Sequence, residues 1–187
     1  MQLLTSLDDL KKTKNLVVTI GSFDGVHRGH LDIFSALKAK AKELNGESMI
    51  VTFDPHPQLV LHPDADFFQI TPSKEKMALL QKQNVDYLMI LPFTYPLAGT
   101  SFTDFFQHFL LDRLHVRALV MGPNHSLGKN RGGKTQDIKE LCDKNEIDVV
   151  VVPELIIDGQ SVRSSEIRRL IHEMEIEQAS KLLGRRL

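Results

Sequence analysis

Two histidines, His27 and His30, lie three residues apart in a glycine-rich stretch of the chain. On the first turn of a helix, residues three apart share one face. Each imidazole can donate a hydrogen bond or carry a positive charge. A helix N-terminus also favours anions, because its free N–H groups and its dipole point toward them. The pair therefore predicts a polyphosphate site.

The histidines lie between a predicted strand and a predicted helix. Residues 16–20 are a short apolar, β-branched run, which is typical of a buried strand. Apolar residues then recur at helical spacing from Leu31 to Leu44. Three glycines in the intervening turn allow backbone torsions and close ligand approach that a side chain would block: Gly21, Gly25 and Gly29.

The string Thr19-Ile20-Gly21-Ser22-Phe23-Asp24-Gly25-Val26-His27-Arg28-Gly29-His30 resembles the HxGH signature of the nucleotidyltransferase superfamily. Members of this superfamily transfer a nucleoside monophosphate and release pyrophosphate. In its longer form the string resembles the FMN adenylyltransferase (FAD synthetase) domain of the bacterial bifunctional riboflavin kinase/FAD synthetase family. The resemblance implies transfer of AMP from ATP to FMN, with Mg²⁺ accompanying ATP.

A second motif, Arg163-Ser164-Ser165-Glu166-Ile167-Arg168, resembles the family's Ser-Ser-Thr-x-Ile-Arg. Serine hydroxyls at a helix start, with Arg168 one turn along, suit phosphate even without the resemblance. An ordinary N-cap with surface arginines would look the same. Arg163 stands where the family usually has serine.

The resemblance implies catalytic roles for His27, His30 and Arg168. It implies ATP contacts from Gly21, Phe23, Asp24, Gly25, His27, Gly29, His30, Asn124, Ser164, Ser165 and Arg168. It implies flavin contacts from Asp54, His56, Asn124, Lys129 and Arg131.

Phe53-Asp54-Pro55-His56-Pro57 ends another predicted strand, because its prolines cannot continue an interior strand or helix. Alone it is a plain strand terminator. It also resembles the Phe-Asp-Pro-His-Pro turn of the FAD synthetase family, which lies near the nucleotide and the flavin. The resemblance thereby makes Asp54 and His56 candidates for the site.

The polar, glycine-rich stretch from Gly122 to Lys134 resembles the family's Gly-x-Asp/Asn-Phe-x-Phe-Gly-x-x-x-x-Gly. His125 and Leu127 replace the two usual aromatic residues. Because aromatic faces stack on planar ligands, we expect their loss to weaken FMN binding.

Residues 128–135 also match the Walker A pattern G-x-x-x-x-G-K-[ST], which would make Lys134 a phosphate ligand. Walker A requires its glycine loop directly after a strand, and here residues 122–127 intervene. We interpret the match as accidental.

The composition excludes several classes of protein. A net charge of −1 argues against a surface that binds nucleic acid, and no apolar run approaches membrane-spanning length. One cysteine, Cys142, and the lack of a signal peptide fit a cytoplasmic protein. A zinc site could be formed by four histidines, His27, His30, His56 and His125, but no ligand spacing supports one. The sequence therefore leaves the residues that would bind a metal undetermined.

Strand and helix patterns alternate along the whole chain. The predicted strands are 16–20, 49–53, 87–91, 118–121 and 149–152. The predicted helices are 31–44, 72–84, 102–114, 135–145, one after Ser164, and 175–184. This order predicts an α/β fold with a Rossmann-like parallel sheet and helices on both faces.

We therefore expect residues 1–187 to form one nucleotidyltransferase domain, without a riboflavin kinase domain, that acts as an FMN adenylyltransferase. Three alternatives remain open at this point. They are an HxGH transferase with another acceptor, a P-loop phosphotransferase that depends on Lys134, and a non-catalytic nucleotide- or flavin-binding regulator. The sequence does not indicate the oligomeric state.

Overall fold

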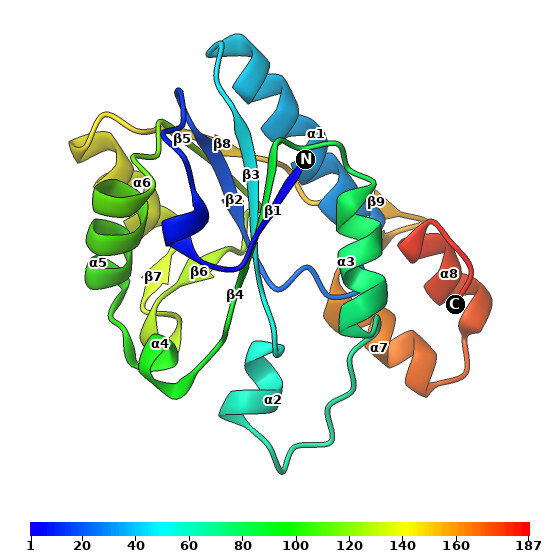
Figure 1. The fold of residues 1–187 in the computed structure, drawn as a ribbon. Coiled ribbons are helices and arrows are strands. Elements are labelled where there is room, and N and C mark those ends of the chain that lie inside the picture. The colour runs from blue at the N-terminus through cyan, green and yellow to red at the C-terminus, as the bar shows by residue number, and fades with distance from the viewer.

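The apolar runs of the chain become the strands of a six-stranded parallel sheet in a computed structural model of residues 1–187. The strand order is β1-β4-β3-β2-β5-β8, with parallel pairing throughout (Figure 1). The strands are β1 (Gln2–Leu4), β2 (Val17–Ile20), β3 (Ser48–Phe53), β4 (Tyr87–Leu91), β5 (Ala118–Met121) and β8 (Asp148–Val151). All five predicted strands are confirmed. Three-residue β1, at one edge of the sheet, is a sixth that the pattern did not predict.

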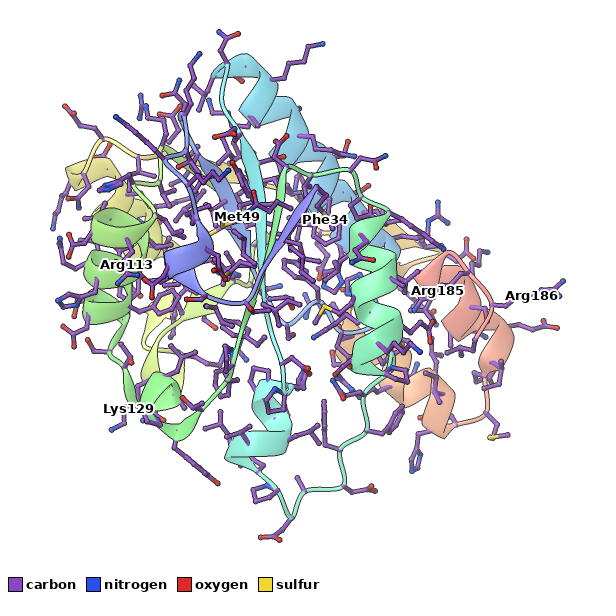
Figure 2. All side chains as sticks on the ribbon, viewed as in Figure 1. Phe34, Met49, Arg113, Lys129, Arg185 and Arg186 are labelled. Carbon is purple, nitrogen blue, oxygen red and sulfur yellow. The ribbon has the colours of Figure 1, made fainter.

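Helices cover both faces of the sheet, as predicted (Figure 1). Alternate residues of a strand point to opposite faces, so each strand supplies two hydrophobic clusters. One cluster joins the sheet to α1 (Arg28–Glu43) and α3 (Ser73–Gln81), with Phe34 at its centre. The other includes Met49 and joins the sheet to η2 (Phe105–Arg113) and α6 (Thr135–Lys144) (Figure 2).

The predicted helix 102–114 is wound differently from an ordinary α-helix. It starts as the short α5 (Phe102–Asp104), which Ser101 caps, and continues as the π-helical η2. Its side chains are nevertheless buried in the core, as in an ordinary amphipathic helix: Phe105, Phe106, Leu110 and Leu114.

Several short elements were not predicted. One of them, α2 (Pro57–Leu61), begins at the last of the prolines that end β3, which agrees with the expectation that no strand or helix continues through residues 53–57. Pro57 occupies the first helical turn, where its missing N–H would have had no helical partner. The others are η1 (Leu7–Asp9), α4 (Tyr95–Gly99), η3 (Lys129–Arg131), the hairpin β6 (Ser126–Leu127) with β7 (Gly133–Lys134), and the hairpin β9 (Ile156–Ile157) with β10 (Gln160–Ser161).

The last two helices, α7 (Ser164–His172) and α8 (Ile176–Leu183), form a separate layer beside α3 (Figure 1). They pack on each other and on Ile70 through a third hydrophobic cluster. None of the helices combines the length and the apolar character needed to cross a membrane.

The chain reverses its direction of winding at β2. After β2 it proceeds to β3 and β4 on one side, and it later returns to β5 on the other side. Ligands of open parallel sheets bind at such a switch point, beyond the carboxyl ends of the strands. The turn after β2 begins at that point.

Candidate active site

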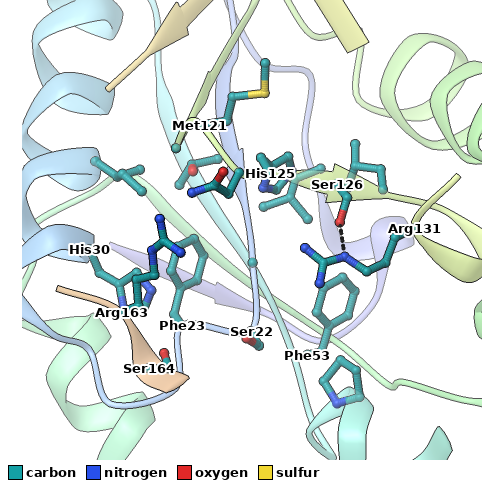
Figure 3. A pocket seen from close by; sticks show the side chains of 18 of the residues that line it. Ser22, Phe23, His30, Phe53, Met121, His125, Ser126, Arg131, Arg163 and Ser164 are labelled. Atoms are coloured by element: carbon teal, nitrogen blue, oxygen red, sulfur yellow. Dashed lines mark hydrogen bonds between the residues drawn. The ribbon is translucent and has the colours of Figure 1, made fainter. Parts of the chain in front are cut away.

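A pocket of about 770 Å³ opens at the carboxyl ends of the central strands. Its lining includes the last residues of β2, β3 and β5 and the residue that follows β8: Ile20, Phe53, Met121 and Val152. Figure 3 shows the side chains converging on this space from the turn after β2, the β6–β7 hairpin and the start of α7. The pocket therefore lies where the topology predicts a ligand.

The turn after β2 has an unusual backbone. Phe23, Gly25 and Val26 have φ values of 46°, 85° and 39°. Left-handed torsions are costly for side chains other than glycine, and most of all for a β-branched residue such as Val26. They let Phe23 fold its ring against Gly21 and bring His27 to the N-cap of α1.

His27 and His30 lie together, as the sequence predicts. Their rings stack with centroids 3.5 Å apart and an interplanar angle of 17°. Nδ1 of His27 accepts a hydrogen bond from the backbone N–H of His30 at 3.2 Å. In the neutral ring, a nitrogen that accepts leaves the proton on the other nitrogen, so Nε2 of His27 is a donor.

Both imidazoles are neutral at physiological pH. Burial lowers the pKa of His27 to about 4, although the Asp24 carboxylate acts in the opposite direction. Burial, with a further contribution from His27, also lowers the pKa of His30 well below its ordinary value. Nδ1 of His30 is buried without a hydrogen-bond partner. Of the two options in the sequence, hydrogen-bond donor or cation, the structure thus favours the donor.

Asp24 does not line the pocket. Its fully buried carboxylate accepts hydrogen bonds from the backbone N–H groups of Ile70 (3.1 Å) and Thr71 (3.2 Å). Nη2 of Arg168 lies 2.5 Å from Oδ2 of the same carboxylate. A buried carboxylate needs such partners, and here they fix the turn to α7 and to the segment before α3.

Arg168 is likewise turned away from the pocket. Besides its pair with Asp24, it donates from Nε to the carbonyl of Phe68 at 3.0 Å and lies 4.5 Å above the ring centroid of Phe67. The side chain anchors Asp24.

At the start of α7, Ser164 lines the pocket, whereas Ser165 is exposed outside it. Oγ of Ser164 donates to the carbonyl of Asp24 at 2.8 Å. The second motif thus holds the first through Ser164 and Arg168, two residues from one turn of α7.

Of the two candidate site residues in the turn after β3, only His56 lines the pocket, and Asp54 does not. His56 lines the pocket, caps α2 by accepting from the N–H of Gln58 at 3.1 Å, and stacks on Phe67. Asp54 lies outside the pocket and accepts from Oγ of Ser73 at 2.5 Å. Asp54 is therefore engaged with the start of α3.

The loop after β5 supplies another wall. Asn124, His125, Leu127 and Arg131 line the pocket, and Nε of Arg131 donates to Oγ of Ser126 at 2.8 Å (Figure 3). Burial lowers the pKa of His125 to about 4, with a smaller contribution from the charge on Arg131. Lys129 lies outside the pocket lining.

The FAD synthetase family model matches residues 9–166. The chain belongs to the FAD synthetase family. It is 33% identical over 171 residues to the bifunctional riboflavin kinase/FMN adenylyltransferase of Listeria monocytogenes, covering 91% of this chain and 54% of that relative. The corresponding protein of Buchnera aphidicola is 30% identical over 186 residues, covering 99% of this chain and 59% of its own length. The chain thus spans less than two thirds of these relatives.

Solved structures share the fold. A macrolide-efflux protein from Streptococcus pneumoniae superposes with a TM-score of 0.83 at 25% identity, covering 98% of this chain and 60% of that chain. The pantoate-beta-alanine ligase of Francisella tularensis, 16% identical, gives a TM-score of 0.57 over 98% of this chain and 85% of its own.

Nine of the site residues that the FAD synthetase resemblance implied line the pocket: Gly21, Phe23, His27, Gly29, His30, His56, Asn124, Arg131 and Ser164. Six lie outside its lining: Asp24, Gly25, Asp54, Lys129, Ser165 and Arg168. Their roles toward ATP and flavin stay predictions, and the structure gives Asp24, Asp54 and Arg168 other partners.

The Walker A match at residues 128–135 of this chain is accidental, as expected. Lys134 is exposed on β7, outside the pocket. Gly128 and Gly133 are needed for packing, since a Cβ atom at either would meet Phe102 within 2.4 Å and 2.2 Å. The two glycines of the pattern are therefore explained by the packing of the β6–β7 hairpin against Phe102.

Sequence reasoning missed two basic residues, one that lines the pocket and one that is buried beside the turns after β2 and β3. Arg163, noticed only as a departure from the FAD synthetase pattern, lines the pocket near His30 and pairs with Glu154 (Figure 3). Lys76 is fully buried in α3 and donates to the carbonyls of Phe53 (2.8 Å) and Ser22 (3.3 Å). No local signal distinguishes Lys76 from the exposed lysines usual on a helix.

Proposed function

We propose that this chain is an FMN adenylyltransferase, which converts ATP and FMN to FAD and pyrophosphate. The observation that carries the proposal is the stacked, neutral pair His27 and His30 at the N-terminus of α1, inside the pocket. Membership of the FAD synthetase family and the printed activity of the relatives support this choice of substrates.

In the proposed reaction an oxygen of the FMN phosphate attacks the α-phosphorus of ATP in line. A P–O bond to FMN forms while the bond between the α-phosphorus and the bridging oxygen breaks, and its electron pair leaves with pyrophosphate. Nε2–H of His27 donates to the phosphate oxygens on which charge accumulates. Such catalysis consists of positioning and preorganised hydrogen bonds, with no covalent enzyme intermediate.

The remaining charge on the triphosphate needs cations. Burial lowers the pKa values of His27, His30, His56 and His125 in the pocket lining, so we assign the cationic role there to Arg131 and Arg163. Ser164 and the N-terminus of α7 add hydrogen-bond donors.

Mg²⁺ fits this site as a companion of ATP. No group of three or more carboxylate, histidine or cysteine side chains is arranged to hold an ion. Mg²⁺ needs few protein ligands, because phosphates and water satisfy most of its coordination. Glu154 is the acidic residue in the pocket lining and would be its protein ligand, and the ion would neutralise the triphosphate.

The isoalloxazine ring of FMN is placed in this proposal against the apolar side of the pocket. Phe53 and Phe93 lie there edge to face, with ring centroids 5.5 Å apart, next to Leu97. An apolar, aromatic wall suits a planar ring system. A cytoplasmic location, fitted by the free Cys142, belongs to the same proposal.

The test is an acceptor panel with purified protein, ATP and Mg²⁺, in which pyrophosphate release and flavin products are measured together. FMN should yield FAD and pyrophosphate in equal amounts. Riboflavin should yield neither, because it lacks the attacking phosphate. Release of pyrophosphate with another phosphate- or amine-bearing acceptor, and not with FMN, would contradict the proposal.

A further inference from the structure

The turn that presents His27 needs external support. Its three left-handed residues include Val26, immediately before His27 in the chain. A torsion of this kind persists only where the surroundings hold it. The support comes from the far end of the chain.

Three consecutive residues at the C-terminal end of α8 contact the turn or Arg28, the first residue of α1. They are Leu183, Gly184 and Arg185. Leu183 lies against Gly25, where an added Cβ atom would meet Leu183 Cδ2 at 3.3 Å. Gly184 lies against the Arg28 side chain, which would be 2.9 Å from a Cβ atom at Gly184. Gly184 also ends α8 in the left-handed conformation, which sends the chain back toward the turn.

Arg185 then donates hydrogen bonds into the turn itself. Nη1 lies 2.6 Å from the carbonyl oxygen of Gly25 and 3.4 Å from that of Val26. Nη2 lies 2.8 Å from Oγ1 of the buried Thr71. A planar guanidinium can serve several acceptors in a fixed geometry, which a single flexible ammonium cannot do.

We propose that Arg185 is a positioning residue, which holds the carbonyl groups of Gly25 and Val26 and thereby fixes His27 for adenylyl transfer. The proposal rests on the proposed function. Asp24, Ser164 and Arg168 secure the first half of the turn, and Arg185 secures the half that leads directly into His27.

Arg186 provides a matched control. It is the next residue, is exposed, and points outward where Arg185 points toward α3 (Figure 2). Replacement of either arginine by alanine removes the same charge from the same end of the chain. Only Arg185→Ala removes the hydrogen bonds to the turn.

The experiment compares FAD formation by the parent, Arg185→Ala, Arg185→Lys and Arg186→Ala at a temperature where circular dichroism shows each variant folded. Small misplacement of a catalytic group lowers rates by about 10²-fold. We expect Arg185→Ala to lower kcat by that order while the KM for ATP changes little, because His27 acts in the transition state. Arg185→Lys should fall between parent and alanine variant, and Arg186→Ala should match the parent.

Equal kcat values for Arg185→Ala and Arg186→Ala, beside an active parent, would overturn this inference and leave the proposed function intact. So would a loss of activity in Arg185→Ala that merely follows its unfolded fraction. If Arg185→Ala does not fold, Arg185→Lys decides, and a parent-like kcat in that variant would overturn the inference. An inactive parent would overturn the proposed function and this inference with it.

Discussion

Nδ1 of His27 accepts a hydrogen bond from the backbone N–H of His30, so one ring nitrogen caps α1 while the other keeps its proton for a ligand. The same bond fixes the ring in the orientation in which it stacks on His30. Helix capping and substrate binding are therefore separate functions of two nitrogens in one side chain, and substitutions can separate them.

His27→Asn should keep the cap and lose the donor. Asparagine is a favoured N-cap residue, and its Oδ1 can accept the His30 N–H in place of Nδ1. Its short side chain does not reach the position of Nε2. We expect a melting temperature close to that of the parent and a kcat lowered by about 10²–10³-fold, as for the loss of one oriented donor. Thermal unfolding and FAD formation check both. The account of His27 fails if this folded variant turns over at the parent's rate, and His172→Ala, an exposed histidine, serves as control.

The unfolding free energy should fall as the pH drops from about 6.5 toward 4. Burial lowers the pKa values of His27, His56 and His125 to about 4, and unfolding returns them to about 6.5. The unfolded chain thus binds more protons than the folded one between these values, so stability present above pH 6.5 is lost below it.

Urea titrations at several pH values measure this loss. His125→Phe should make the slope shallower by up to about 1.4 kcal/mol per pH unit, whereas the exposed His172→Phe should leave it unchanged. A stability that is constant or rises on acidification from pH 6.5 to 5 would show that these histidines are protonated in the folded protein.

Asp24 is expected to matter for folding first. Asp24→Asn removes the charge that Arg168 pairs with and leaves a buried amide among N–H donors. Breaking a buried ion pair from one side costs about 3–5 kcal/mol. Urea unfolding should show a loss of that order, while Asp32→Asn, an exposed carboxylate on α1, should show none. Equal stability of the two variants would remove Asp24 as the anchor of the turn.

Arg163 should bind the triphosphate. A hydrogen bond to a charged group contributes about 1.5–3 kcal/mol, so Arg163→Ala should weaken ATP binding by at least about tenfold. Arg169→Ala is the matched control on the same helix, since Arg169 pairs with Glu166 and Glu173 outside the pocket. Calorimetric titration with a non-hydrolysable ATP analogue gives both affinities. Equal affinities of Arg163→Ala and Arg169→Ala for the ATP analogue would mean that Arg163 pairs with Glu154 and does not bind the triphosphate.

The loop after β5 should limit FMN affinity. His125 lines the pocket where related proteins are expected to carry an aromatic residue. His125→Phe should tighten FMN by roughly tenfold, or 1.4 kcal/mol, and leave ATP binding unchanged. Leu127 is a poorer target, because it is buried in the main core and a larger side chain there would overpack it. An unchanged FMN affinity in the folded variant would exclude His125 from flavin recognition.

The sequence predicted those features that depend on residues close together in the chain. The apolar runs predicted the five long strands, and the spacing of His27 and His30 predicted their shared face. The pairing of β1 with β4 depends on contacts distant in the chain, which a three-residue run does not reveal. The same holds for the site: the sequence does not reveal the pairing of Asp24 with Arg168, because the two residues are 144 positions apart.

Sequence also cannot tell which side of a turn faces the ligand. Within residues 53–57, His56 and Asp54 are two positions apart, yet only His56 reaches the pocket. In the sequence, Arg163 is only a departure from the family's second motif. In the structure its side chain lines the pocket. Lys76 and Arg185 act on backbone carbonyl groups, which leave no trace in residue types.

The most direct test of the central claim follows the phosphorus label of ATP. Purified protein is incubated with FMN, Mg²⁺ and ATP labelled at the α-phosphate or, separately, at the γ-phosphate, and the products are separated. Adenylyl transfer predicts that the α-label appears in FAD and the γ-label in pyrophosphate, with both transfers lost in His27→Asn. The γ-label in a flavin product, or the α-label in free AMP alone, would contradict the account.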